Sequence, residues 1–460
     1  MTTRAAVREW VDDQLDRVAL QHPARLALGG FALVIVFFTM LLYQPFATAS
    51  GRRPPLIDAF FMATSATTVA GLTTVDNGTY WTPFGMTVLV IAMMVGGFGI
   101  MTMAALLGLA VSRRLGLTTR LLAADETKAT SLGDVKGLLR TILIVSITTE
   151  AVISLVVFVR LLAHDFPVGR ALGHAVFYSV SAFNNVGLQP DAGGIVPFPG
   201  DALFRMALPV CSFMGALGYP IYLDLRRSWQ RPRKWSLHTK LTLVTIGIVQ
   251  VFSVGLLAAF EWTNPKTLGA FHGSTKVWQL IFVSFNQRTG GFAGLDHGLM
   301  HQQTWLLESI LMFIGAGSGG TAGGIRVTTL AVLLLAIWSE ARGRRDIEAF
   351  GKRIGTEVLR LAVAVTLVSL FVVIVATGVV LAQSTSQDFG LGRVLFEVSS
   401  GFATVGLTTG ITPFLTDGAK LTVAAVMFIG RVGSLTVVAA LALNKQRLYI
   451  RYPSERPLIG

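Results

Sequence analysis

The sequence predicts an all-α integral membrane protein of four pseudo-repeats, each made of a helix, a re-entrant pore loop and a second helix, with eight full transmembrane spans around a central pore. Apolar residues make up 52% of the 460 residues and charged residues only 14%, unlike a soluble domain. Several apolar runs approach the roughly 20 residues that cross a ~30 Å hydrocarbon core. They are Leu26–Leu42, Met86–Val111, Ile142–Leu162, Leu241–Phe260, Leu359–Leu381 and Leu421–Leu443.

The pseudo-repeats follow from a motif that recurs along the whole chain. Its clearest copy is Thr404-Val405-Gly406-Leu407-Thr408, and weaker copies contain three earlier glycines. The equivalent glycines are Gly71, Gly187, Gly291 and Gly406, spaced 116, 104 and 115 residues apart. A period this regular indicates four similar units around one axis.

Charge placement sets the orientation. Lys and Arg number four in 1–25, six each in 113–140, 226–240 and 342–360, and four after Asn444, whereas the intervening loops hold few. This is the positive-inside pattern, and it explains the +13 net charge without nucleic acid. Both termini and the three basic loops are therefore expected in the cytoplasm. Residues 1–23 have no signal-peptide cleavage site and are interpreted as a cytoplasmic helix on the membrane surface.

With this orientation the chain divides into four units followed by a cytoplasmic tail at 445–460. The units are 24–112, 138–226, 236–341 and 354–444. Each contains a segment of about twelve residues that is too short to cross a bilayer. These half-helices are expected at 56–67, 171–182, 275–286 and 392–403. Each leads into a loop of Gly, Thr or Asn, and irregular backbone at membrane depth is tolerated only where protein buries it or water lines it.

The four loops have the chemistry of a selectivity filter. Backbone carbonyls can replace the hydration shell of a cation, and glycine lets four backbones meet closely. A half-helix whose C-terminal end points at the cavity adds negative potential. A single Thr-Val-Gly is usually a cap or turn, but four at regular spacing favour a filter. The predicted filter residues are Thr68, Val69, Ala70, Gly71, Asn185, Val186, Gly187, Thr289, Gly290, Gly291, Thr404, Val405 and Gly406.

At this point the sequence resembles the Trk/Ktr/HKT superfamily of potassium transporters, most closely the membrane subunit of Ktr-type systems, over nearly all of 24–444. The carrying residues are the four loops, Asn286 to Phe292, the glycine-rich run Gly317 to Thr329, and Gly430-Arg431-Val432-Gly433. The first three loops lack the full Thr-Val-Gly-Tyr-Gly form. A filter with fewer well-ordered sites is therefore expected.

The resemblance implies potassium uptake through a gated, channel-like pore in the plasma membrane, here the inner membrane of a bacterium. It further implies a homodimer on a cytoplasmic ring of RCK-type regulatory subunits, with the nucleotide bound by those partners rather than by this chain. Potassium would be the bound ion, with sodium as an additional candidate and no covalent cofactor. The basic loops 113–140 and 226–240 are candidate docking surfaces, although anionic lipid headgroups would explain the same charge.

A glycine-rich run interrupts the third unit at 315–327. A phosphate-binding loop would need a preceding strand, and none is expected nearby. The resemblance implies an intramembrane gate below the filter. Its predicted residues are Gly315, Gly317, Ser318, Gly319, Gly320, Thr321, Gly323, Gly324 and, from the last span, Arg431. Because Val432–Leu443 continues that span, Arg431 is expected to face the cavity rather than the interface. Arg326 could bind the gate loop or simply begin a helix.

Two further charged residues are predicted to support the filter. Glu397 lies two turns before the fourth loop and could accept backbone N–H bonds, with direct ion contact as the alternative. Arg288 in the third loop is expected to pair with a carboxylate rather than repel cations. Glu150 and Glu308 could pair with Arg160 or Arg205, but sequence spacing does not decide this.

An enzyme is not expected. His297 and His301 have ligand-like spacing beside Asp296, but the Glu that follows the first His in zinc proteases is missing, so a solvated loop is predicted. Cys211 is the only cysteine and is expected to pack in the core.

Two alternative functions remain: an ion-coupled secondary transporter with inverted repeats, or a less selective sodium and potassium pathway.

Overall fold

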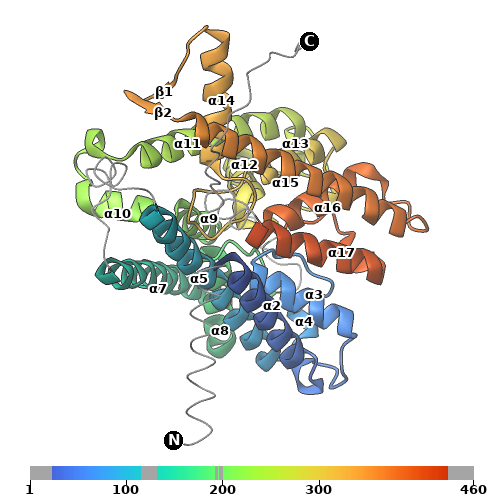
Figure 1. Ribbon diagram of the computed structural model, residues 1–460. Helices are drawn as coiled ribbons and strands as arrows, with labels where there is room; N and C mark the ends of the chain where they lie inside the picture. Colours follow the sequence, from blue (N-terminus) through green and yellow to red (C-terminus); the bar gives the residue numbers. More distant parts are fainter. Residues whose placement is uncertain (1–22, 115–131, 192–194, 196–199, 434–460) are drawn as a thin grey trace, which may run out of the picture.

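A computed structural model describes residues 23–114, 132–191, 195 and 200–433 (Figure 1). The predicted N-terminal surface helix, residues 434–444 of the last unit and the segment 445–460 lie outside these residues. The described chain is mostly helical, as the sequence predicts for a membrane protein. Its elements follow one order four times: a long helix, a short helix, an irregular loop and another helix.

The helices of the first two units are α2 (Pro23–Leu42), α3 (Leu56–Thr68), α4 (Asn77–Tyr80), α5 (Pro83–Arg114), α7 (Leu132–Ala163), α8 (Val168–Phe183), α9 (Ala202–Leu217) and α10 (Tyr219–Ser228). Those of the last two are α11 (Leu237–Glu261), α12 (Gly273–Phe285), α13 (Gln302–Phe313), α14 (Val327–Ala341), α15 (Thr356–Gln383), α16 (Gly390–Ala403) and α17 (Asp417–Phe428). The short helices α3, α8, α12 and α16 lie where half-helices were expected. Two π-helical turns, η4 (Asn286–Gly290) and η7 (Ile429–Gly433), follow α12 and α17.

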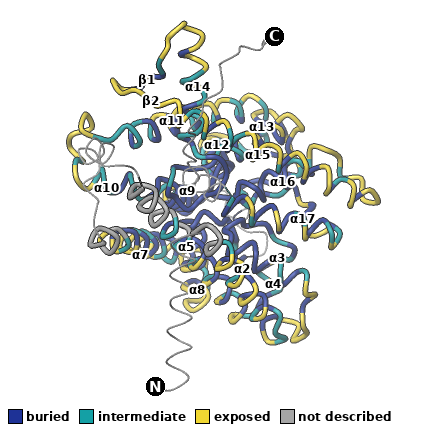
Figure 2. Tube along the Cα trace, in the orientation of Figure 1, coloured by how far each residue is buried: buried dark blue, intermediate teal, exposed yellow. Residues whose placement is uncertain are grey.

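The four units close into a ring. In each unit the second helix packs against the short helix of the next unit: α5 against α8, α9 against α12, α13 against α16, and α17 against α3. The last contact joins the end of the described chain to its beginning. Figure 2 shows the buried residues gathered at the centre of the molecule.

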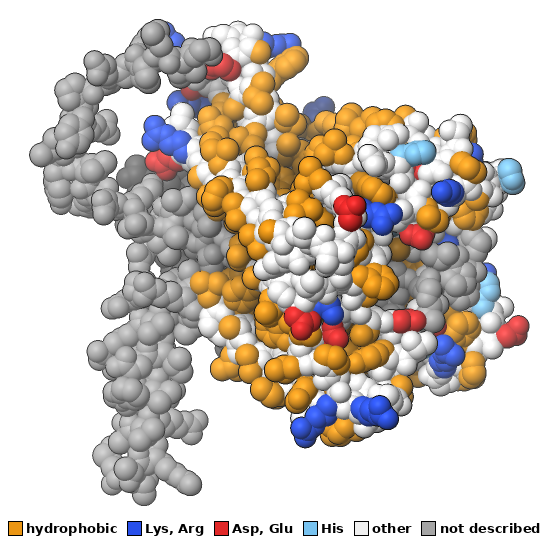
Figure 3. Space-filling view, turned by 90° about the vertical axis from the view of Figure 1, so that its right-hand side faces the viewer, with side chains coloured by type: hydrophobic (Ala, Val, Ile, Leu, Met, Phe, Trp, Pro, Cys, Tyr) orange, Lys and Arg blue, Asp and Glu red, His pale blue; other side chains and the backbone are white. Residues whose placement is uncertain are grey.

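Among the described residues, four helices are long and apolar enough to cross a membrane, α5, α7, α11 and α15. The α9–α10 pair makes a fifth candidate, but it bends by 92° at Gly218. Shorter apolar helices run over Leu28–Leu42 and Val327–Ala341. The long helices α11 and α15 carry exposed apolar side chains such as Val251 (75% exposed) and Phe371 (67% exposed). Hydrophobic side chains cover much of the face in Figure 3, as expected where lipid replaces water.

Two departures from the expected fold concern local geometry. The chain is not wholly α-helical, because strands β1 (Ile347–Ala349) and β2 (Lys352–Ile354) form an antiparallel hairpin in the third basic loop. Phe350 and Gly351 in its two-residue turn both have positive φ, as a type I′ turn requires.

The second departure is the bend at Gly218, between α9 and α10. Gly218 has φ 84°, and a Cβ there would lie 2.5 Å from the carbonyl oxygen of Ser318. The bend therefore brings α9 directly against the glycine-rich loop.

A buried ion pair fastens the two ends of the ring. Lys420 in α17 donates to the Asp58 carboxylate in α3 at 2.9 Å, and both side chains are about nine-tenths buried. Breaking a buried pair leaves one uncompensated charge. Asp58→Asn is therefore expected to destabilise the folded protein by about 3 kcal/mol, measured as a lower thermal unfolding midpoint in detergent.

The matched control removes an exposed pair. Arg353 and Asp346 are 2.9 Å apart, but both side chains are largely solvated, and exposed pairs contribute little. Asp346→Asn should leave the midpoint unchanged. Equal midpoints for Asp58→Asn and the wild type would show that the ring does not depend on this contact.

Candidate functional site: four loops and the segment beneath them

The four predicted glycines meet at the centre of the molecule. All have positive φ, between 71° and 96°. A Cβ on Gly71 would lie 1.7 Å from the carbonyl oxygen of Val186 and 2.9 Å from Gly406 Cα. One on Gly187 would lie 2.6 Å from Gly291 Cα, and one on Gly291 would lie 1.8 Å from the carbonyl oxygen of Val405. Only glycine fits both the backbone angle and the space at these positions.

The loop carbonyls face this crowded centre. The carbonyl oxygens of Val186 and Val405 point at neighbouring glycines, and that of Ala70 would lie 3.0 Å from a Cβ on Gly406. The amides of these three residues are held the opposite way, each bonding to a serine carbonyl five residues earlier, at 2.8 to 3.0 Å. The amide groups of the loops are thus hydrogen-bonded to the short helices, whereas the loop carbonyl groups face the space between the loops.

Backbone strain marks the same position in three units. Val69, Asn185 and Thr404 each lie two residues before one of the predicted filter glycines and have left-handed φ of 61°, 57° and 51°. For β-branched residues this conformation costs roughly 1–2 kcal/mol. It persists only where surrounding contacts impose it. The third unit differs: Thr289 and Gly290 lie in the π-helical turn η4, not in an extended loop.

Three further glycines support the ends of the short helices, and only one of them, Gly430, belongs to a motif quoted from the sequence. A Cβ on Gly96, Gly215 or Gly430 would lie 1.8 to 1.9 Å from a carbonyl oxygen four residues before a filter glycine, those of Thr67, Phe183 and Phe402. Each supporting glycine comes 24 to 28 residues after its filter glycine, a spacing that could have revealed them.

The glycine-rich segment between α13 and α14 passes directly beneath the loops. Its Thr321 hydroxyl accepts a 2.6 Å hydrogen bond from Asn185 Nδ2 and donates to the carbonyl of Phe183. Gly323 N donates to Thr404 Oγ1 at 2.9 Å. The segment therefore touches the second and fourth loops. All of its predicted residues lie between α13 and α14: Gly315, Gly317, Ser318, Gly319, Gly320, Thr321, Gly323 and Gly324.

Backbone bonds fix the segment to α9 and to the two helices that it joins. Gly317 N donates to Ala216 O and Thr321 N to Gly215 O, both at 3.1 Å. At its base Gly315 N bonds to Ile325 O, and Ile325 N bonds to Phe313 O. The segment is thus a defined loop with backbone bonds at both ends, rather than a continuation of a helix.

One buried and one partly buried arginine bind carbonyls of this segment. Arg431 is 1% exposed, and its guanidinium donates to Thr321 O and, at 3.5 Å, to Gly96 O. Arg326 precedes α14 and donates from Nη1 to Ala322 O at 2.7 Å and to Gly317 O at 3.3 Å. Arg326 therefore does both things that the sequence left open: it precedes the helix and binds the loop.

Glu397 in α16 holds the outer end of the fourth loop. Its Oε1 accepts from Thr408 Oγ1 at 2.6 Å, Thr409 N at 2.8 Å and Thr409 Oγ1 at 3.1 Å, while Oε2 accepts from Thr412 Oγ1 at 2.8 Å. The side chain is fully buried. One carboxylate thus fixes three threonines that follow Gly406.

The expected pairing of Arg288 with a carboxylate is wrong, and the partners that the sequence left open for Glu150 and Arg160 are now defined. Within the described residues Arg288 forms no ion pair with a carboxylate, and its buried Nε and Nη1 have no hydrogen-bond partner. Glu150 accepts from Asn184 Nδ2 at 3.2 Å. Arg160 pairs with Asp201 and not with a glutamate. Cys211 is buried in the core, as expected.

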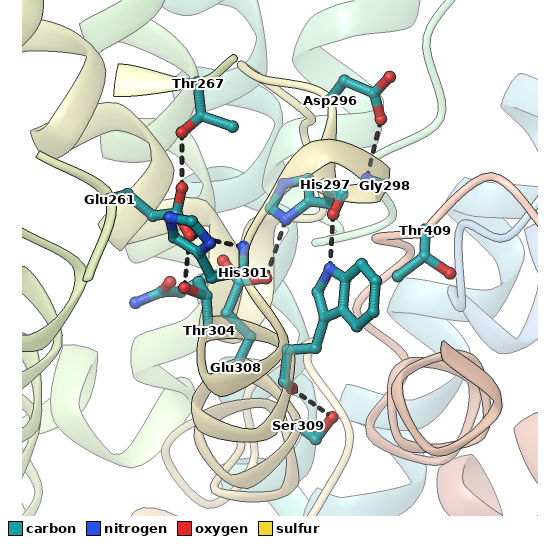
Figure 4. A network of polar contacts seen from close by, with 12 residues as sticks. Glu261, Thr267, Asp296, His297, Gly298, His301, Thr304, Glu308, Ser309 and Thr409 are labelled. Carbon is teal, nitrogen blue, oxygen red and sulfur yellow. Dashed lines mark hydrogen bonds and ion pairs between the residues drawn. The ribbon is translucent and has the colours of Figure 1, made fainter. Parts of the chain in front are cut away.

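The prediction of a solvated loop at His297 is also wrong. His297 is 2% exposed, and its Nδ1 lies 2.9 Å from Glu308 Oε2 (Figure 4). His301 is exposed, and only its backbone amide joins the network, through Glu261. No group of three metal-ligating side chains is present in the part of the chain that the structure describes.

Comparison with known proteins places these features in a family. A family model described as a TrkH cation transport protein matches residues 29–450. The chain is 35% identical to the Ktr system potassium uptake protein B of Bacillus subtilis, over 98% of this chain and 99% of that one. It is 30% identical to the potassium/sodium uptake protein NtpJ of Enterococcus hirae, over 95% and 97%.

A solved structure has the same fold. The potassium transporter TrkH from Vibrio parahaemolyticus superposes with a TM-score of 0.66 at 17% identity, covering 91% of this chain and 85% of that chain.

The Glu397 contacts generate a stability prediction. Glu397→Ala leaves one amide and three hydroxyls without their acceptor inside the protein, which should lower the free energy of unfolding by about 3 kcal/mol. Glu397→Gln keeps one oxygen and should lose about half as much. Thermal unfolding in detergent measures both. Glu340→Ala on the exposed face of α14 is the control, and an Ala variant as stable as this control would contradict the assignment.

Proposed function

Because the chain belongs to the TrkH family of cation transport proteins, we propose that it takes up potassium across the plasma membrane through a gated, channel-like pore. The observation that carries the proposal is the meeting of Gly71, Gly187, Gly291 and Gly406, with loop carbonyls facing the space between them. Potassium is the substrate here, and the four loops form the filter.

The filter works by replacing water with carbonyl oxygens. A potassium ion entering between the loops exchanges its hydration shell for backbone dipoles. The short helices α3, α8 and α16 end immediately before their loops, so the partial negative charge at their C-terminal ends adds to the attraction. Because η4 replaces an extended turn in the third unit, this filter presents fewer equivalent carbonyls than a fourfold-symmetric one.

The packing order of the helices favours a channel-like path over an ion-coupled secondary transporter. Inverted repeats would alternate in direction around the site. Here the second helix of every unit packs on the short helix of the next in one sense around the ring. A less selective sodium and potassium pathway remains the second candidate, because the relative NtpJ is named a potassium/sodium uptake protein. Glycine at all four positions favours potassium.

The segment beneath the filter is the proposed gate. It lies against the inner ends of the second and fourth loops and is held there by Arg326 and Arg431. Its glycines give it alternative backbone conformations at little steric cost. Ion flow requires the segment to leave this position, which breaks the arginine bonds to its carbonyls.

The names of two relatives support a proposal for the assembly. The potassium uptake protein B of Bacillus subtilis and that of Vibrio alginolyticus are both named as Ktr system proteins. We infer a homodimer with eight spans per chain and cytoplasmic termini, on a ring of RCK-type regulatory subunits that bind the nucleotide. The described basic loop 226–240 carries exposed Arg226, Arg227 and Arg231. It is a docking surface for that ring.

The filter is tested by rubidium uptake into proteoliposomes with sodium as competitor. Serine at Gly406 or Gly187 would force neighbouring backbones apart, because its Cβ meets backbone atoms at 2.6 Å or less. Each variant should lower the preference for potassium over sodium by roughly tenfold, or ~1.4 kcal/mol.

Gly410→Ser is the matched control. Gly410 follows the same loop with φ 87°, but a Cβ there meets nothing within 4 Å. This variant carries the backbone strain without the clash and should keep its preference. Unchanged selectivity in both filter variants, or equal loss in the control, would contradict the filter.

The gate is tested by Arg431→Gln. Losing a charge-assisted bond to Thr321 should weaken the closed position by about 1.5 kcal/mol, and rubidium flux should rise roughly tenfold. Arg160→Gln removes an arginine that binds Asp201 instead and should not change flux. Flux that falls in Arg431→Gln while the protein stays folded would rule out a holding role for the arginine.

A further inference from the structure

The same turn follows the filter in the first and third units. Asp76 Oδ1 accepts from Gly78 N at 3.0 Å, and Asp296 Oδ1 accepts from Gly298 N at 2.8 Å. The residue between Asp and Gly is Asn77 in one unit and His297 in the other, each six residues after its filter glycine. Both of these side chains are buried.

Each turn contacts the filter loop of the next unit. Asn77 Nδ2 donates to the carbonyl of Gln189, two residues after Gly187, at 3.4 Å. In the third unit Gly298 packs on the fourth loop, where a Cβ would lie 2.8 Å from the carbonyl oxygen of Thr409. Thr409 is one of the residues that Glu397 holds. The two turns are therefore equivalent links from one unit to the next filter loop.

His297 is what fixes the second link. Its Nδ1 bonds to Glu308 in α13, and its carbonyl oxygen accepts from Trp305 Nε1 at 2.6 Å (Figure 4). Its ring centroid lies 5.9 Å from that of Phe396, the residue that precedes Glu397. Within the described residues His297 Nε2 and Glu308 Oε1 have no hydrogen-bond partner. Each side chain thus depends on the other, and losing either leaves a buried polar group unpaired.

We propose that the His297–Glu308 pair is a positioning element that holds the outer end of the fourth loop, so that the selectivity of the pore depends on the charge of His297. The inference rests on the proposed filter. Asn77 cannot titrate, whereas histidine is the side chain that changes charge near neutral pH. The third-to-fourth link is therefore sensitive to protons, and the first-to-second link is not.

The surroundings determine the sign of the effect. Burial opposes a charge on His297. The attraction of Glu308, the hydrogen bond that the His297 ring donates to Glu308, and the added attraction of Asp296 and Glu261 outweigh burial and raise the pKa of His297 above its ordinary value. The ion pair is complete at low pH and is lost as pH rises through that raised pKa. The other charged groups near this turn and the loops around it are Arg205, His301, Arg393 and Glu397.

The test is calorimetric titration of potassium and sodium into the full detergent-solubilised chain between about pH 6 and pH 9. Binding does not require an open gate. In the wild type the preference for potassium should fall as pH rises, by about tenfold for the loss of one charge-assisted bond. His297→Asn, which installs the residue of the first unit, and Glu308→Gln should each abolish the pH dependence.

Asp58→Asn is the matched control, because it breaks another buried ion pair of the ring that contains no histidine. It should keep the wild-type pH profile although it is less stable. A pH-independent preference in the wild type, or a wild-type profile in His297→Asn, would overturn this inference alone. Absence of any potassium preference in the wild type would overturn the filter and this inference with it. The wild-type profile decides the matter even where a variant does not fold.

Discussion

At the centre of this protein four backbones approach so closely that no side chain fits between them. A Cβ on Gly71 or Gly291 would lie within 1.8 Å of a neighbouring carbonyl oxygen. Carbonyl dipoles crowded in this way repel one another unless a cation or a rigid frame compensates. Much of the surrounding structure serves as that frame.

The frame acts at three levels. Gly96, Gly215 and Gly430 let second helices press on the ends of the short helices. Strained residues such as Val69 and Thr404 then turn the chain so that carbonyls face inward. Outside the loops, Glu397 and the turns at Asn77 and His297 hold the chain that leaves the four central glycines. A change at any level reaches the carbonyls through rigid contacts rather than through a flexible linker.

Closure of the ring explains why the four units can differ in detail. Because each second helix supports the next short helix, no unit depends only on itself. The third unit departs most, with η4 before its glycine and a broken second helix that supplies the segment beneath the four loops. Helix α9 of the neighbouring unit stabilises this irregular segment, because its carbonyl groups accept hydrogen bonds from the segment's amides.

Features with a local signal were predictable from the sequence. The four glycines recur at a regular spacing, the short helices are bounded by polar and glycine residues, and the run after Gly315 cannot form a uniform helix. These signals lie within short stretches of the chain and do not depend on tertiary contacts. Glu397 was also identified, because a carboxylate in an apolar segment requires a donor nearby.

Features that depend on distant partners were not predictable. His297 was expected in solvent because a loop with Asp, His and Gly is usually exposed. Its partner Glu308 lies in the following helix, and Thr409 belongs to another unit, so neither contact has a local signal. Gly96 and Gly215 carry no local signal that separates them from the other glycines among the 48 of the chain. The bend at Gly218 and the π-helical turn η4 arise from tertiary contacts, which override local preference.

The most direct measurement is the position of thallium, a potassium substitute with strong anomalous scattering, in crystals of the full chain. The account predicts thallium between the loops of Gly71, Gly187, Gly291 and Gly406, displaced by potassium more readily than by sodium. Thallium bound only elsewhere, for example beside the buried Glu150 carboxylate, with none between the four loops, would contradict it.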